Sequence, residues 1–186
     1  YIIMKINKFL PIFLVLAFTV ASCSKDDDPA PEAVNEEEVI TTMEVTLTSG
    51  ASVITLKTQD LDGDGPNAPV VTVSGNLAAG TTYDGVMKFL NELESPAEDI
   101  TEEVEEEDLD HQVFFTVGSG LDVTTEYSNN DSAGNPLGTQ FKLIAGSASS
   151  GNLTFTLVHE PTKPNTGLAS AGGSTDIETT FSITIE

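Results

Sequence analysis

Alternation of apolar and polar residues limits what this chain can fold into more than any other feature of its sequence. In residues 177–185 the apolar residues Ile177, Phe181, Ile183 and Ile185 alternate with polar ones. Residues 39–48 repeat the pattern, with Val39, Thr41, Met43, Val45 and Leu47 on one face. A period of two puts successive side chains on opposite faces of a β-strand. The sequence therefore predicts half-buried strands in both segments.

Several more segments have strand character, and clusters of Gly, Asn, Asp, Ser and Pro separate them. The expected strands are 39–48, 53–58, 70–74, 81–91, 111–117, 121–127, 139–145, 152–159 and 175–185. So many short strands, with almost no helix, predict an all-β fold, specifically an antiparallel immunoglobulin-like β-sandwich. The immunoglobulin disulfide and core tryptophan are missing, so this prediction depends on the number and spacing of the strands.

Residues 92–110 interrupt the strand pattern, because they are rich in Glu and Asp and contain no basic residue. A short helix beginning near Pro96 and Asp99, with Ile100 and Val104 on its inner side, is slightly favoured. An edge strand also fits, since Ile100 and Val104 have the same parity. The simplest interpretation of the acidic segment is a solvated face. A weak collector of cations, or a docking surface for a basic partner, is the alternative.

The N-terminal residues have the pattern of a secretory signal. Lys5 and Lys8 form a positive region after Met4, and the apolar run from Phe9 to Val20 is shorter than the roughly 20 residues that span a bilayer. We therefore expect residues 1–22 to be a lipoprotein signal peptide. Residues 23–38, acidic and containing proline, are expected to be a disordered tether, and residues 39–186 the β-sandwich domain.

Two short motifs at this junction resemble known export signals. Val20-Ala21-Ser22-Cys23 resembles the bacterial lipobox, which implies that Cys23 is lipidated and becomes the first residue of the mature chain. Lys25-Asp26-Asp27-Asp28 resembles the surface-export signal of Bacteroidota lipoproteins. It implies attachment to the outer membrane through the lipid anchor, with the domain facing the cell surface. Cys23 is the only cysteine, so no internal disulfide is expected.

The charge balance limits the possible partners. The chain has 30 acidic residues, seven lysines and no arginine. Such a surface repels nucleic acid, so no nucleic-acid partner is expected. It attracts metal ions and basic proteins, although high charge also serves solubility alone.

The aspartate-rich loop is the first candidate metal site. Asp60, Asp62 and Asp64 alternate around Gly63, which resembles the opening of an EF-hand-type calcium loop. The closing glutamate is absent, because the twelfth position from Asp60 is Val71. A plain turn between strands is therefore slightly favoured over a calcium site.

The two histidines form the second candidate site. His111 begins one predicted strand and His159 ends another, and each has the parity of inward-facing residues. If these strands are antiparallel neighbours, the imidazoles share one edge of the domain, where Glu160 is a candidate third ligand for zinc or copper. In the alternative, each histidine hydrogen-bonds to the backbone of its adjacent turn. Calcium or a transition metal is thus the candidate cofactor.

Catalytic motifs are weak throughout the chain. Gly118-Ser119-Gly120 has no strand-to-helix context for a nucleophile elbow, and no arginine is available to stabilise an oxyanion. We therefore predict a protein that is not an enzyme.

Three segments together resemble a group of small Bacteroidota outer-membrane lipoproteins: 60–69, 111–115, and 159–165 with 172–177. Proteins of this group often carry the label of a type 1 periplasmic binding fold. That fold requires two α/β lobes, whereas the strands here lack crossover helices. The resemblance implies a surface lipoprotein that works near an outer-membrane transporter. We expect a binding protein that captures a ligand for such a receptor, with a metal or a metal complex as the candidate ligand. A structural or adhesive docking module is the alternative.

Overall fold

The computed structural model describes residues 38–63 and 65–186 of the chain. The predicted signal peptide, the lipidation site Cys23 and the predicted tether up to residue 37 lie outside the described residues, and so does Asp64. Among the residues described, no helix combines the length and the apolar character that a membrane span requires.

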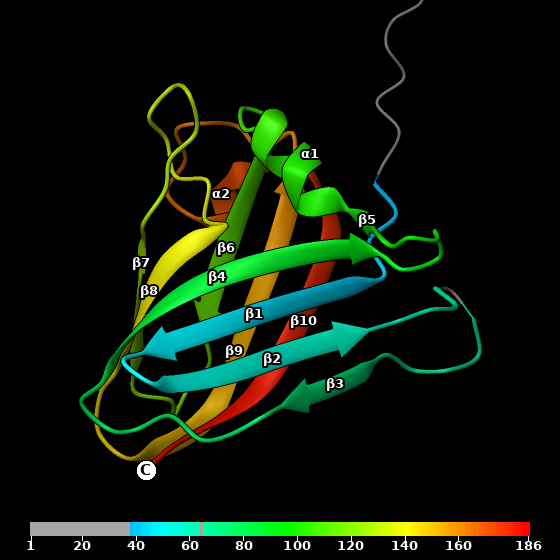
Figure 1. Ribbon diagram of the computed structural model, residues 1–186. Helices are drawn as coiled ribbons and strands as arrows, with labels where there is room; N and C mark the ends of the chain where they lie inside the picture. Colours follow the sequence, from blue (N-terminus) through cyan, green and yellow to red (C-terminus); the bar gives the residue numbers. More distant parts are fainter. Residues whose placement is uncertain (1–37, 64) are drawn as a thin grey trace, which may run out of the picture. The chain divides into compact units, whose positions relative to one another are not determined.

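The described residues are mostly β-structure, as the alternation predicts (Figure 1). The strands are β1 (Thr42–Ser49), β2 (Ser52–Gln59), β3 (Val70–Val73), β4 (Thr82–Asn91), β5 (Glu98–Asp99), β6 (His111–Val117), β7 (Val123–Tyr127), β8 (Gln140–Ala145), β9 (Ser149–His159) and β10 (Ser174–Ile185). The helices are α1 (Ile100–Glu106) and α2 (Leu168–Ala171).

The strands form two antiparallel sheets. One has seven strands in the order β3-β2-β1-β4-β8-β7, with β5 paired to β4. The other has three strands in the order β10-β9-β6. Every strand pair within these sheets is antiparallel. The prediction of an all-β, antiparallel fold is therefore confirmed.

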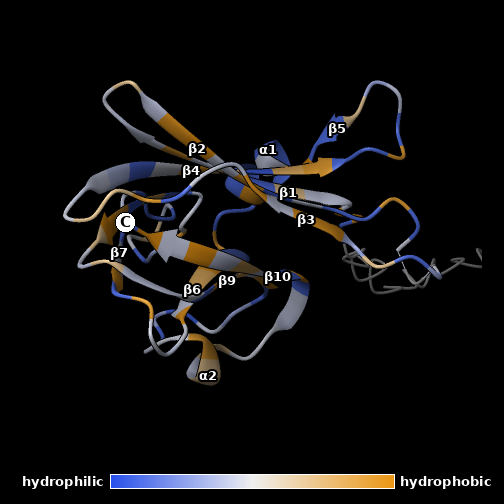
Figure 2. Ribbon diagram, turned by 90° about the horizontal axis from the view of Figure 1, so that it is seen from below, coloured by the Kyte–Doolittle hydropathy of each residue, from blue (hydrophilic) through white to orange (hydrophobic). Residues whose placement is uncertain are grey.

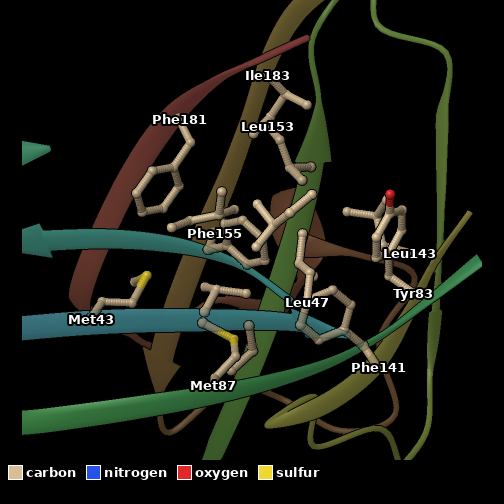
Figure 3. Packing of buried hydrophobic residues seen from close by; sticks show 14 of the residues in the cluster. Met43, Leu47, Tyr83, Met87, Phe141, Leu143, Leu153, Phe155, Phe181 and Ile183 are labelled. Carbon is tan, nitrogen blue, oxygen red and sulfur yellow. The ribbon is translucent and has the colours of Figure 1, made fainter. Parts of the chain in front are cut away.

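One hydrophobic core joins the two sheets, and Figure 2 shows β1 to β4 on one side of it and β6, β9 and β10 on the other. The inward residues Met43, Val45 and Leu47 of β1 are fully buried, as their alternation predicts. Phe155 of β9 lies between Phe141 of the larger sheet and Phe181 of β10, with ring centroids 5.7 and 5.8 Å away (Figure 3). Aromatic contacts of this kind add to the free energy of burial and hold the sheets together.

Three local features differ from the predictions. Val39 was expected on the inner face, but β1 begins only at Thr42 and the Val39 side chain is 55% exposed. The segment 160–173 contains the unpredicted helix α2, which places Ala171 against Phe114 and Val158 on the outer side of the smaller sheet. In β10 the alternation is broken, because Thr175 pairs with Val158 and Ile177 with Leu157, leaving Asp176 as an extra residue. This arrangement is a β-bulge.

The acidic segment forms a short helix preceded by a two-residue strand. Asp99 caps α1, since its Oδ1 accepts a hydrogen bond from the backbone N–H of Thr101 at 3.2 Å. Ile100 and Val104 are buried, one turn apart, which confirms the helical alternative. The Thr101 hydroxyl also accepts a hydrogen bond from the backbone N–H of Phe89, which attaches α1 to β4. The C-cap residue of α1 is Glu107, whose backbone lies next to His111.

Candidate metal centre

Four metal-ligating side chains meet at one end of the smaller sheet. They are Glu38, His111, His159 and Asp176, and we call them the four-ligand group. One nitrogen or oxygen atom from each of the four lies within 4.8 Å of the corresponding atom of every other. Among the described residues, this is the one group of three or more such side chains with ligand atoms this close.

The two histidines are brought together by the pairing of β6 with β9. His111 and His159 are directly opposed in this antiparallel register, and their ring centroids lie 4.8 Å apart. Opposed residues project from the same face of a sheet, with their Cβ atoms only about 4.5–5.5 Å apart. Both imidazoles are almost completely buried. The structure thus shows the neighbouring strands that the sequence prediction required.

Asp176 reaches the histidines because of the bulge in β10. A bulge changes the direction in which a side chain projects and is common beside functional sites. The Asp176 side chain is only 1% exposed, and its Oδ1 lies 3.8 Å from Nδ1 of His159. Without the extra residue, the alternation of β10 would direct position 176 to the same face as the exposed Glu178.

Glu38 completes the group from the segment just before β1. Its Oε1 is 3.1 Å from Nε2 of His111, and its side chain is only 8% exposed. The two atoms are not aligned as a hydrogen bond, and Nε2 of His111 makes no hydrogen bond with any described residue. The Oε2 atom of Glu38 likewise makes none. Buried polar atoms normally have a hydrogen-bond partner. Nε2 of His111 and Oε2 of Glu38 therefore indicate that a ligand binds between these two side chains.

The backbone at the end of α1 determines which nitrogen of His111 is available. Nδ1 of His111 lies 3.1 Å from the carbonyl oxygen of Glu107. A carbonyl oxygen only accepts, so Nδ1 carries the proton and donates it. With the proton on Nδ1, the lone pair of the ring in its neutral form is on Nε2, which faces Glu38. Metal-ligating histidines typically donate from one ring nitrogen to a carbonyl and bind the metal through the other.

Lys163 binds the backbone at His111. Its ammonium group donates to the carbonyl oxygens of Asp108 and His111, at 2.7 and 2.5 Å, and to Oδ2 of Asp131 at 3.1 Å. The Lys163 and Asp131 side chains are 6% and 0% exposed. Burial alone raises the pKa of Asp131, but hydrogen bonds from Asn135 and Lys163 outweigh it and hold that pKa below its ordinary value.

The surroundings of the group are electronegative. Glu103 in α1 has a raised pKa, because it is partly desolvated and because Glu98, Glu38, Glu107 and Glu106 repel its negative charge. A negative potential at a buried site attracts a cation and disfavours an anion.

The chemistry of the group is compatible with zinc. Two imidazole nitrogens and two carboxylate oxygens are a ligand set that zinc binds tetrahedrally, at about 2.0–2.2 Å from each ligand atom. Tetrahedral ligand atoms at that radius lie about 3.3 Å from one another, close to the 3.1 Å between Glu38 and His111. Ligand atoms as far as 4.8 Å apart have to approach each other by about 1.5 Å to bind one ion. A divalent ion would also neutralise the two buried carboxylates, which otherwise repel each other.

The other predicted ligands lie elsewhere. Glu160 is exposed, and its backbone N–H donates to the carbonyl of Asp110 at 2.6 Å. It is not part of the four-ligand group. β9 ends at His159, and Glu160 has a left-handed backbone conformation with φ 51°, so the chain turns away from the strand at this residue.

The described part of the aspartate-rich loop is a hydrogen-bonded turn. Oδ1 of Asp60 accepts from the backbone N–H groups of Asp62 and Gly63, at 3.2 and 3.0 Å. Oδ2 of Asp62 accepts from the Asn67 side chain at 2.6 Å, and this hydrogen bond is the main cause of a lowered pKa for Asp62. These are the bonds of an Asx-type turn, the alternative that the sequence left open. Asp64 lies outside the described residues.

Two members of the four-ligand group, Glu38 and Asp176, were not among the predicted site residues. Glu38 is the last of three consecutive glutamates, and nothing local distinguishes it from Glu36 and Glu37. Asp176 follows the alternation of an outward-facing residue. An aspartate among the Thr and Ser residues of a strand is uncommon, and this was the one available signal.

Comparison with protein-family models, with curated proteins and with solved structures found no match. The functional argument therefore depends on the geometry of the four-ligand group.

Proposed function

We propose that this protein is a lipid-anchored binding protein whose β-sandwich domain, immunoglobulin-like in architecture, holds one zinc ion in the four-ligand group. The observation that carries the proposal is the pair formed by Glu38 and His111. Their facing atoms lie 3.1 Å apart without hydrogen-bond alignment, while the other nitrogen of His111 faces a carbonyl. A metal ion is the ligand that satisfies both atoms at once.

The closed geometry supports binding over catalysis. Four side chains supply four ligand atoms, so no coordination position is left for a substrate or an activated water. All four side chains are 8% exposed or less. A catalytic zinc site keeps one position open, whereas a closed site retains its ion. The site therefore suits an ion that is carried or that holds the domain together.

The placement of the protein rests on its sequence. The resemblance of residues 20–23 to a lipobox and of residues 25–28 to a surface-export signal supports attachment of Cys23 to the outer membrane, facing outward. An outer-membrane transporter is the proposed receptor, because the resemblance of the domain to small Bacteroidota lipoproteins implies this setting. Mass spectrometry of the mature N-terminus tests the anchor, and an unmodified Cys23 thiol contradicts it.

Metal analysis of the full-length protein tests the site. The chain is produced with its leader, purified in detergent and assayed for bound metal, and its zinc affinity is measured by competition with a chelator. His111→Ala and His159→Ala are compared with Glu160→Gln, which removes a charge beside His159 but outside the four-ligand group. X-ray absorption spectroscopy reports the ligands.

We expect one zinc ion per chain, bound by nitrogen and oxygen atoms. Each histidine variant is expected to lose at least about 100-fold in affinity, since removal of even an outer-shell partner costs about 10–100-fold. The Glu160→Gln variant is expected to bind as the unaltered protein does. Protein that neither contains nor takes up zinc contradicts the proposal, and so does equal binding by both histidine variants.

A further inference from the structure

A cavity adjoins the four-ligand group on one side. It has a volume of about 230 Å³ and lies between β10, the end of β2 and the residues before β1 and β3. Its lining residues are Ile40, Thr41, Thr58, Asp60, Pro69, Asp176, Ile177, Glu178 and Thr179. Asp176 thus belongs both to the wall of the cavity and to the four-ligand group. The cavity is large enough for several water molecules.

A buried, closed site needs a polar route by which a cation arrives. The four side chains are nearly inaccessible to solvent. A divalent ion sheds its water only where other oxygen atoms replace it, because transfer of a bare charge into an apolar medium costs far too much free energy. Asp176 lines the cavity, so its carboxylate can supply oxygen atoms of this kind to an arriving ion.

Three acidic residues, Asp60, Asp176 and Glu178, line the cavity. Asp60 lies on the wall contributed by β2, and Glu178 lies on β10 beside Asp176. Among the described residues that line the cavity, none is basic. The Glu178 carboxylate is held by the Thr156 hydroxyl, which donates to its Oε2 at 2.9 Å. Walls of one charge sign concentrate counter-ions and speed their arrival.

Asp60 also connects this cavity to the surface. It lines a second cavity, of about 240 Å³, together with exposed residues of the aspartate-rich loop, among them Asp62 and Asn67. The aspartate-rich loop therefore adjoins the first cavity through Asp60. A carboxylate at each step, from Asp62 to Asp60 and then to Asp176, provides successive oxygen ligands for a hard or borderline cation.

We infer that zinc reaches the four-ligand group through the cavity beside β10, and that Asp60 and Glu178 are the residues that guide it. They act on the rate of metal uptake and not on the affinity, because neither belongs to the four-ligand group. The inference rests on the proposed function, since it concerns access to that metal site. It also gives the aspartate-rich loop a role in uptake in place of a calcium site of its own.

Rapid-mixing kinetics test the route. Zinc is mixed at low ionic strength with metal-free full-length protein and with the Asp60→Asn/Glu178→Gln double variant, and association is followed by release of zinc from a coloured chelator. The matched control is Asp84→Asn/Glu126→Gln, which removes two negative charges from β4 and β7, outside the lining of the cavity. Equilibrium affinity is measured for all three proteins by chelator competition.

We expect the route variant to bind zinc about tenfold more slowly than the control, the lower end of the range for electrostatic guidance. Its equilibrium affinity is expected to stay within about twofold of the control, because a change in the barrier along the route alters the rates of uptake and release by the same factor. The rate difference is also expected to shrink as salt is added, since salt screens the carboxylates.

The outcomes separate the route from the site. Unaltered protein that binds no zinc contradicts the proposed function itself. Zinc binding at equal rates in the route variant and the control overturns the route and leaves the site intact. A route variant that loses as much affinity as His111→Ala also overturns the inference, because Asp60 or Glu178 would then be a ligand. Thermal unfolding of each variant verifies its fold, and the salt dependence of the unaltered protein provides a measurement free of substitutions.

Discussion

His111 and His159 occupy directly opposed positions in the β6–β9 pair, and their ring centroids lie 4.8 Å apart. The register of this one strand pair positions half of the four-ligand group. The other half consists of Asp176, at the bulge of β10, and Glu38, in the segment before β1. A metal ion bound there would join the start of the described chain to all three strands of the smaller sheet.

Zinc is therefore expected to stabilise the fold, and Asp176→Asn is expected to remove that effect. A ligand that binds only the native state at 100 times its dissociation constant adds about 2.7 kcal/mol to the free energy of unfolding. Urea unfolding with zinc, and with a chelator, measures this difference. Glu160→Gln serves as the control and should keep the full effect. Equal stabilisation of the two variants would show that zinc acts elsewhere.

Lys163→Met is expected to destabilise the protein strongly. The substitution leaves the Asp131 carboxylate buried without its cation and frees the carbonyls of Asp108 and His111. Loss of one partner of a buried ion pair costs about 3–5 kcal/mol. Urea unfolding in the presence of a chelator measures the change. The Lys163→Met/Asp131→Asn double variant should recover part of the loss, and a double variant less stable than Lys163→Met would contradict this account.

Asp131 makes the free energy of unfolding depend on pH within a defined range. The pKa of Asp131 is lowered in the folded protein, so its carboxylate stabilises the fold fully above the unfolded value of about 3.9. As the pH falls from there through the lowered folded pKa, the unfolded state binds more protons and the stabilisation is lost.

Asp131→Asn tests this window. The difference in unfolding free energy between the unaltered protein and the variant is expected to be constant from about pH 5 to 7 and to shrink below about pH 4. Denaturant unfolding at each pH, with a chelator present, supplies the values. A difference that stays constant down to pH 2.5 would rule out this role for Asp131.

Gly85→Ala is expected to disturb the core through Phe141. Gly85 of β4 is paired with Phe141 of β8, and an added Cβ would overlap the aromatic ring. Overpacking of this kind costs about 1–3 kcal/mol. Gly75→Ala is the control, because a Cβ at Gly75 meets no atom within 4 Å, and its effect should stay within about 0.5 kcal/mol. Thermal unfolding compares the two, and equal effects would show that Phe141 moves aside freely.

The parity of residues along a strand could be predicted because it is a local property. Met43, Val45 and Leu47 are buried as expected, and both histidines lie on the inner face. The helix at 100–106 was also predictable, since Asp99 caps it and Ile100 and Val104 lie one turn apart. The bulge in β10 was not, because an extra residue becomes visible only once the partner strand is in place.

By itself, the sequence determined the strand content, the inward direction of His111 and His159 and the acidic character that attracts cations, since each follows from local pattern or from composition. Only the tertiary structure decided that Glu38 and Asp176, and not Glu160, join the histidines. The reason is that these four residues are far apart in the chain. Their distances depend on strand order, register and one bulge, which result from packing of the whole domain and leave no mark on the neighbouring residues.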